Sequence, residues 1–529
     1  MTRNRLLGLG LALLVAACAD RETPTETSVP DLAKSSIPKG TITINVALKA
    51  PLTAGQRTEL ARYGAIRREI PELAVVFVHS KAANLPAIQG LPFVESAGTD
   101  AERNARPVNP PTALPDNFAG GLSTWDQDVI NATEFKQGRA QSLTGEGVWV
   151  GVLDTGLLPQ WPSYFSRERI AEEYGISFGG GAGPNEFNVS TQKNKWEQDT
   201  DSHGTHVTSI ILGYERPDLA SNSGTTHVNG TAPRVTVVPV KVLNNNGSGW
   251  SSAIAEGVFY ITRLKLDGKI GPKVVINMSL GGSILDPVEK RALDFATDNG
   301  VVVVASAGNG GANGMGFPGA YTRTLSVGAI GWVDEFPNVT NPAVPGTTPA
   351  HPAGAPCELL QAFPADQFTT GRFWRQCNPP ELGTGDEAAF IRNFYITDFS
   401  ARRKTGQDLD VVAPGSWIVG PYQTQQAKLS YFFVGGTSQA APHVTGIVAL
   451  MLQKDAGVAS LVAAGAGDDQ TTSDRITRAE QILQQNAIPF GSHTSATFYD
   501  GGPGNTVTQT WDATATGFGL ATADRALDF

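Results

Sequence analysis

The chain has 529 residues, 40% of them hydrophobic, and a formal net charge of −10 at pH 7. This apolar content is enough for one large core and a smaller domain. The charge is spread along the chain without an acidic or basic block, which argues against a nucleic-acid partner and against an electrostatic membrane patch.

The N-terminus predicts an export signal. Arg3 and Arg5 precede an apolar run, 6–17, that is too short to span a bilayer comfortably. We therefore interpret residues 1–17 as a signal peptide and expect an exported protein. The run ends in Val15-Ala16-Ala17-Cys18, which resembles the bacterial lipobox and implies lipidation of Cys18 and a cell-envelope lipoprotein. The alternative is an ordinary signal peptide and a secreted protein.

A small domain is predicted to follow. Residues 18–40 are polar and rich in threonine and proline, as in a flexible tether. Hydrophobic periodicity then predicts a small α+β domain at 41–100 and a Pro-rich linker at 101–120. Its expected elements are strands at 41–46, at 73–78 and around Phe93, and helices at 54–63 and 81–89.

The hydrophobic pattern of the sequence changes in the rest of the chain, 121–529. Short apolar runs at 148–153, 236–242, 273–277 and 300–305 are typical of buried parallel strands. Helix-length segments such as 251–264 and 287–299 lie between them. This alternation predicts an α/β, doubly wound, mostly parallel sheet with its reactive groups at the strand ends.

Two later stretches lack periodicity. Residues 332–394 are rich in Pro, Ala and Gly and are interpreted as an insertion, either on the surface or lining a cleft. They contain Cys357 and Cys377, which we expect to form a disulfide because an exported protein tolerates one. Two free thiols are the alternative. Residues 456–473 are expected to form a surface loop.

Two polar residues are placed for acid–base chemistry. Asp154 directly follows an apolar run, so its carboxylate should stand at the carboxyl end of a buried strand. His203 follows Asp201 and Ser202, either of which could cap a helix that begins there. Asp154 could instead cap the next turn, and His203 could share a metal with His206, although the zinc-peptidase pattern H-E-x-x-H is absent. We expect His206 to be structural.

Ser438 is the candidate nucleophile. It lies in Gly435-Gly436-Thr437-Ser438-Gln439-Ala440-Ala441-Pro442, where the glycines permit a tight turn and Pro442 is expected in the first turn of a helix. A serine at a helix start is often only a cap, so a catalytic role requires a base nearby, and His203 is the candidate. The G-x-S-x-G elbow of α/β-hydrolases is absent.

Three sequence blocks together resemble subtilisin-like serine proteases of peptidase family S8. They are Val152-Leu153-Asp154-Thr155-Gly156, His203-Gly204-Thr205-His206-Val207 and Gly436-Thr437-Ser438-Gln439-Ala440-Ala441-Pro442-His443-Val444, in the chain order Asp, His, Ser. The resemblance covers residues from about 117 onward. It implies a subtilisin-like fold and a serine endopeptidase that cuts polypeptides through an acyl-enzyme.

The resemblance also implies roles for further residues. Asn309, in Ala305-Ser306-Ala307-Gly308-Asn309, would donate its amide to the oxyanion. The segment Ser279-Leu280-Gly281 would pair with the substrate backbone, and Gly308 and Gly316 would line a roomy specificity pocket. Gln439 departs from the methionine that many members carry beside the nucleophile, which should leave the mechanism intact.

The same resemblance implies that the domain at 41–100 is an inhibitory propeptide that the enzyme removes by self-processing. A permanent accessory domain is the alternative. We expect a monomer whose chemistry needs no cofactor. Structural calcium is expected by analogy alone, with no ligands assigned, because no acidic loop matches an oxygen-ligand pattern.

Two other classes of function remain open. A binding protein with a dead protease cleft would not need the complete Asp154, His203 and Ser438 set. A lipid or ester hydrolase is disfavoured by the missing nucleophile elbow. Hydrolysis of a peptide and of a short ester, each compared with the Ser438→Ala variant, separates these possibilities.

Overall fold

The computed structural model describes residues 40–108, 112–113, 125–132, 143–179, 189–217, 225–333, 387–423, 431–463, 475–499 and 506–529. The expected signal peptide, the tether and Cys18 lie outside these residues, as do Cys357 and Cys377. In the part of the chain so described, no helix is both long enough and apolar enough to cross a membrane.

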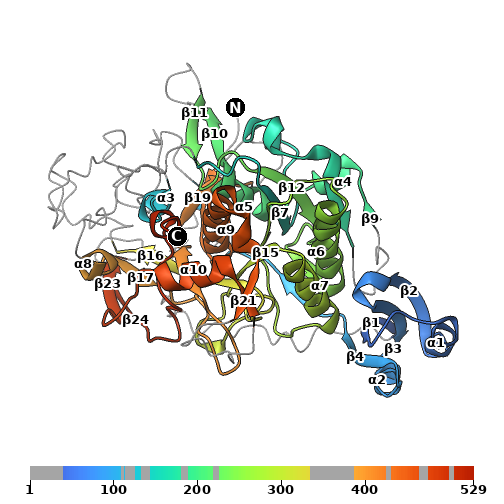
Figure 1. Ribbon diagram of the computed structural model, residues 1–529. Helices are drawn as coiled ribbons and strands as arrows, with labels where there is room; N and C mark the ends of the chain where they lie inside the picture. Colours follow the sequence, from blue (N-terminus) through green and yellow to red (C-terminus); the bar gives the residue numbers. More distant parts are fainter. Residues whose placement is uncertain are drawn as a thin grey trace, which may run out of the picture. The chain divides into compact units, whose positions relative to one another are not determined.

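Residues 40–100, which we call the N-terminal unit, form a four-stranded antiparallel sheet in the order β2-β3-β1-β4 (Figure 1). A cluster that includes Ile44, Val46, Val76 and Leu60 forms its core. The elements are β1 (Thr41–Leu48), α1 (Ala54–Leu60), β2 (Gly64–Ile70), β3 (Val75–Lys81), α2 (Leu85–Gln89) and β4 (Val94–Thr99). Strand β2 was not expected, because three of its seven residues are charged and it lies at the sheet edge.

The remainder, which we call the body, is built on a nine-stranded sheet in the order β17-β16-β15-β14-β7-β12-β8-β9, with β18 also paired to β16. The pairs are parallel except at β9 and β17. Its strands are β7 (Trp149–Asp154), β8 (Ile176–Phe178), β9 (Val189–Ser190), β12 (Thr236–Lys241), β14 (Val274–Met278), β15 (Val301–Ser306), β16 (Leu325–Trp332), β17 (Phe394–Ile396) and β18 (Val411–Pro414).

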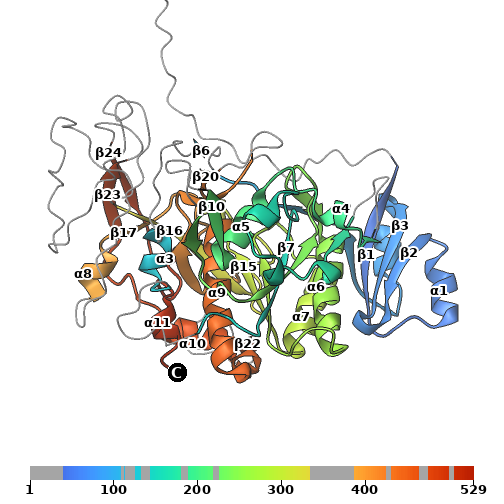
Figure 2. The same cartoon turned by 90° about the horizontal axis from the view of Figure 1, so that it is seen from above.

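Helices cover both faces of this sheet (Figure 2). Val302 and Val304 of β15 belong to one apolar cluster with residues of two helices, and the alternate residues Val301 and Val303 belong to another. The first pair of helices is α5 (His203–Leu212) and α9 (Thr437–Lys454), and the second is α6 (Ser251–Leu266) and α7 (Pro287–Asp298). Burial of both faces explains the continuous apolar runs and confirms the doubly wound prediction.

The order of the strands singles out β7. The chain places β12 on one side of β7 and then crosses to place β14 on the other. The carboxyl end of β7 is therefore a point where the winding direction reverses, and such points open a crevice in α/β sheets. Asp154 is the last residue of β7.

The remaining elements lie around this frame. The expected insertion at 332–394 has ends that belong to the fold, since Trp332 ends β16 and Phe394 begins β17, both fully buried. In the stretch expected to be a surface loop, 456–473, Val462 pairs antiparallel with Ile476. The elements are β5 (Glu102–Asn104), β6 (Thr112–Ala113), α3 (Trp125–Val129), α4 (Lys193–Trp196), β10 (Gly213–Pro217), β11 (Thr225–Asn229), β13 (Ser248–Trp250), α8 (Glu387–Ile391), β19 (Ile418–Pro421), β20 (Tyr431–Val434), β21 (Leu461–Ala463), β22 (Arg475–Thr477), α10 (Arg478–Asn486), β23 (Ser495–Tyr499), β24 (Thr506–Thr510) and α11 (Ala523–Ala526).

Candidate active site

Asp154 and His203 meet at the carboxyl end of β7. Both are fully buried, and His203 Nδ1 lies 2.9 Å and 3.0 Å from the two carboxylate oxygens of Asp154. The backbone N–H of Thr155 also donates to this carboxylate. Gly204 lets α5 approach the strand, because a Cβ there would lie 2.4 Å from the carbonyl oxygen of Gly156. The predicted strand-end position of Asp154 is thus found.

The cap of α5 differs from the prediction. Ser202 precedes the helix in a left-handed conformation, φ +75°, and its side chain caps nothing. The buried carboxylate of Asp199 instead accepts from the N–H of Ser202 and from the N–H and hydroxyl of Thr205. A cap two residues before Asp201 was missed because the sequence does not show the turn that brings Asp199 back to the helix.

The surrounding charges favour a protonated imidazole. Burial by itself would lower the pKa of His203, but the charge of Asp154 and its hydrogen bond outweigh burial, with help from Asp201 and Asp199. The net result raises the pKa of His203 above its ordinary value of 6.5. Burial also raises the pKa of Asp201, to about 6.

His206 is a structural residue, as predicted. Its Nε2 atom lies 3.1 Å from the carbonyl oxygen of Ile418, and burial lowers its pKa to about 3. The ring therefore stays neutral and links α5 to β19. We find no arrangement in which His203 and His206 share a metal, because the described groups of potential metal ligands include neither.

Ser438 is the second residue of α9, which confirms its predicted place at a helix start. Pro442 is inside the helix rather than in its first turn, because α9 begins earlier, at Thr437. A proline has no N–H for the carbonyl four residues before it, here that of Ser438. The hydroxyl of Ser279 donates to that carbonyl instead, at 2.8 Å.

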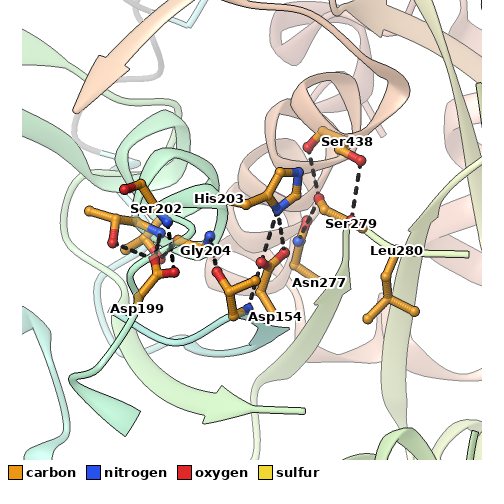
Figure 3. A network of polar contacts seen from close by, with 12 residues as sticks. Asp154, Asp199, Ser202, His203, Gly204, Asn277, Ser279, Leu280 and Ser438 are labelled. Carbon is orange, nitrogen blue, oxygen red and sulfur yellow. Dashed lines mark hydrogen bonds and ion pairs between the residues drawn. The ribbon is translucent and has the colours of Figure 1, made fainter. Parts of the chain in front are cut away.

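Ser438 and His203 face each other without a hydrogen bond. In Figure 3 the imidazole lies between Asp154 and Ser438, with its second nitrogen toward the serine. Among the described residues, His203 Nε2 has no hydrogen-bond partner, and Ser438 Oγ donates to the carbonyl oxygen of Ser279 at 3.1 Å. In this structure the serine hydroxyl is therefore directed to Ser279 and not to the imidazole.

Asn309 is held by its oxygen. The N–H and the hydroxyl of Thr437 both donate to Asn309 Oδ1, at 2.9 Å each. This fixes the amide plane and leaves the two Nδ2 hydrogens free of those contacts. A Cβ on Gly436, two residues before Ser438, would lie 3.3 Å from that Nδ2. The amide therefore lies beside the start of α9, close to the backbone N–H of Ser438.

The expected substrate-binding residues lie together. A Cβ on Gly308, which has φ +104°, would lie 3.1 Å from the N of Gly316, and one on Gly316 would lie 3.4 Å from the carbonyl of Gly282. These glycines thus adjoin the segment that contains Ser279, Leu280 and Gly281. The side chain of Leu280 is buried and points away from Ser438 (Figure 3).

The segment 102–108 lies along the expected substrate-binding edge, which the sequence did not reveal. Strand β5 pairs antiparallel with β13, and Asn104 exchanges two backbone hydrogen bonds with Gly281, at 2.9 Å and 3.0 Å. Ala105 N donates to the carbonyl of Gly247, and Val108 N donates to that of Gly435. The edge predicted to bind substrate is thus paired with the chain's own segment.

The N-terminal unit contacts the body beside α6 and α7. Asn45 of β1 donates to Asp286, the N-cap of α7, and to Asp100. Asp100 in turn accepts from the N–H of Ser252 and from the hydroxyls of Ser251 and Ser252 at the start of α6. Burial and the nearby Asp100 raise the pKa of Asp286 to about 7.

A group of carboxylates elsewhere tests the expectation of calcium. Asp408, Asp410 and Glu480 are buried and have oxygens within 4.8 Å of one another. Calcium takes six to eight oxygen ligands. This set offers three carboxylates, and both oxygens of Asp410 also accept hydrogen bonds, from Ser326 and Gln484, so it falls short of a calcium ligand set. We assign no metal ligands among the described residues.

Comparisons with known proteins agree with this geometry. A model described as the subtilase family, Peptidase_S8, matches residues 145–495. Subtilisin DY of Bacillus licheniformis is 30% identical over 320 residues, 60% of this chain and 80% of that protein. Alkaline elastase YaB of Bacillus sp. (strain YaB) is 29% identical over 328 residues, 62% of this chain and 60% of the elastase.

A solved structure shows the same fold. Fervidolysin from Fervidobacterium pennivorans, described as a keratinolytic enzyme related to subtilisin, aligns with a TM-score of 0.57 at 18% identity. The alignment covers 92% of this chain and 61% of the fervidolysin chain. Since the family model matches more than half of the chain, this protein belongs to the subtilase family of serine endopeptidases and has a subtilisin-like fold.

Proposed function

We propose that the chain is an exported serine endopeptidase, made as a zymogen, in which Asp154, His203 and Ser438 form the catalytic triad. The observation that carries this proposal is the position of His203 Nδ1 within 3.0 Å of both oxygens of Asp154. A proton held on Nδ1 by the carboxylate leaves Nε2 as the acceptor, and Nε2 is the nitrogen that faces Ser438.

The chemistry follows from these positions. Nε2 of His203 removes the hydroxyl proton of Ser438 as Oγ attacks the peptide carbonyl carbon. Asp154 stabilises the imidazolium, and the amide of Asn309 with the N–H of Ser438 stabilises the oxyanion. The imidazolium then protonates the leaving amine, and a water molecule, deprotonated by the same nitrogen, hydrolyses the acyl-enzyme. Members of the family need no cofactor for this reaction.

The zymogen proposal is supported by the segment 102–108. A strand that pairs with Gly281 and Gly247 fills the place where a substrate strand would add to the edge. We propose that the N-terminal unit is the propeptide, that the enzyme cuts the chain between about 98 and 121, and that the released unit inhibits until it dissociates. Gly308 and Gly316 are proposed to line the pocket for the residue before the cut.

The remaining assignments concern residues outside the described ranges. We propose that residues 1–17 direct export, that Cys18 carries a lipid anchor, and that Cys357 and Cys377 form a disulfide. The enzyme would then act as a monomer on polypeptides, either at the cell envelope or secreted. Structural calcium remains an expectation without assigned ligands.

The test is the intact mass of the purified wild-type chain and of Ser438→Ala after incubation under folding conditions. The exposed Ser460, changed to alanine, is the matched control. We expect the wild type and Ser460→Ala to lose the N-terminal unit and Ser438→Ala to stay full length. If all three stay full length and the wild type hydrolyses no peptide, the proposal fails. Hydrolysis of a short ester alone would instead indicate an ester hydrolase.

A further inference from the structure

The register of the segment 102–108 places one of its residues next to Ser438. Asn104 is opposite Gly281 in an antiparallel pair. Two residues further along, the same register puts Arg106 opposite Ser279, whose carbonyl oxygen is 3.1 Å from Ser438 Oγ. Val108 is held beyond this point by Gly435. Arg106 is therefore in the position of the residue before a cut, P1, and Arg103 is at P4.

The side chain of Arg103 is fully buried in the body. Its Nε donates to Oε1 of Glu289 at 3.0 Å, and Nη2 donates to Oε2 of the same carboxylate, so the pair is bidentate. Nη2 also donates to the carbonyl of Ile284 at 2.9 Å. Neither Arg103 nor Glu289 has any exposed side-chain area. By contrast, Arg106 is exposed.

The guanidinium of Arg103 is tightly packed against the backbone at Gly282. A Cβ added to Gly282 would lie 2.7 Å from Nη1 of Arg103 and 2.3 Å from the carbonyl oxygen of Glu102. Glu289 is in the first turn of α7, and Asp286 caps that helix. Burial would lower the pKa of Arg103, but Glu289 and then Asp286 and Asp100 more than offset this and raise it.

When the segment 102–108 leaves, Glu289 loses the guanidinium of Arg103 as its partner. Glu289 is buried only while the segment covers it, so its carboxylate must be solvated or paired with another cation once the segment leaves. Glu289 and the nearby Asp286 belong to the body, so both stay when the N-terminal unit dissociates. A substrate strand with a planar cation at P4 would restore the bidentate pair, and one with an apolar or acidic side chain would not.

We propose that the mature enzyme has a cation-selective P4 subsite, formed by Glu289, the carbonyl of Ile284 and Gly282, that selects arginine four residues before the cut. This inference rests on the proposed function. It assigns Glu289 as a specificity-determining residue.

The test uses autoprocessed wild-type enzyme and tetrapeptide coumarylamides X-Asn-Ala-Z. Z is the residue that the enzyme cleaves best in an Ala-Ala-Ala-Z series, and X is arginine, its neutral isostere citrulline, norleucine or glutamate. We expect kcat/KM for arginine to exceed that for citrulline by about 10- to 100-fold, because a desolvated charge-assisted pair is lost. The peptides with norleucine or glutamate at X should have a kcat/KM no higher than that of the citrulline peptide.

Two variants test whether Glu289 causes the preference for arginine at X. Glu289→Gln should reduce the ratio of arginine to citrulline to near one, and Glu173→Gln, which removes an exposed charge, should keep the wild-type ratio. Equal rates for arginine and citrulline with the wild type overturn the inference, and that result does not depend on the folding of any variant. If peptides are cleaved without discrimination at X, the proposed function stands. If no peptide is cleaved, both proposals fail.

Discussion

The amide of Asn309 is fixed by its oxygen, which makes its nitrogen a preorganised donor. Two hydrogen bonds of 2.9 Å from Thr437 hold Oδ1. Asn309→Ala removes the donor without touching Asp154, His203 or Ser438. Of the two donors proposed for the oxyanion, only the backbone N–H of Ser438 would then remain.

The expected loss is in kcat rather than in KM, because the donor acts on the oxyanion and hardly on the bound carbonyl. We expect kcat to fall by about 10²–10³, the loss measured for such a donor in subtilisin itself. That corresponds to about 3–4 kcal/mol of activation free energy. Thr437→Val removes one of the two bonds that orient the amide, worth about 1 kcal/mol, and should cost about fivefold.

The assay is steady-state hydrolysis of one peptide by the autoprocessed enzymes, with Ser438→Ala as the baseline and thermal unfolding as the check on folding. If Asn309→Ala processes itself too slowly to yield mature enzyme, the rate at which it loses the N-terminal unit, followed by intact mass, replaces turnover as the readout. A smaller loss in Asn309→Ala than in Thr437→Val would refute the reasoning. A change confined to KM would do the same.

Two further predictions concern pH. Because His203 must be neutral to accept a proton and its pKa is raised chiefly by Asp154 against the effect of burial, kcat/KM should fall on acidification with a midpoint above 6.5. Imidazole NMR of Ser438→Ala with and without Asp154→Asn should show a lower pKa in the double variant; an unchanged one would contradict the assignment. Burial and Asp100 raise the pKa of Asp286 to about 7, so the docked state binds an extra proton. Docking of the cleaved N-terminal unit should therefore weaken as pH rises towards about 7 and stay constant above it, measured by gel filtration, and Asp286→Asn should flatten the profile.

Much of the frame could be predicted from the sequence. The four apolar runs predicted as strands of the body are β7, β12, β14 and β15, each within one residue of its predicted bounds. They could be predicted because strands buried on both faces have continuous apolar sequences. Asp154 could be placed because it ends such a run. The α+β unit was predicted for a similar reason, since alternate residues of β1 and β3 fill its core.

The contacts that complete the site could not be predicted, because each depends on segments distant in sequence. Asp199 reaches α5 through a turn that has no sequence signal. Arg103 lies in a stretch that reads as a polar linker, and its partner Glu289 is 186 residues away on an amphipathic helix. A charged residue of that kind is ordinarily solvated, so only the folded chain reveals that this one is buried.

The Arg103–Glu289 pair also answers a question that backbone pairing leaves open, namely what sets the register of the segment in the groove. The hydrogen bonds to Gly281 and Gly247 involve backbone atoms, so a two-residue shift that brings Glu102 to Gly281 and Arg103 to Gly247 would keep them, whereas the opposite shift would bring Pro107, which has no N–H, to Gly247. A shift of one residue would turn Arg103 to the opposite face of the strand, and either shift would leave Glu289 buried without a cation. The ion pair therefore makes one register favourable, and that register puts Arg106 at Ser438. The same selection would act on any substrate strand that enters the groove later.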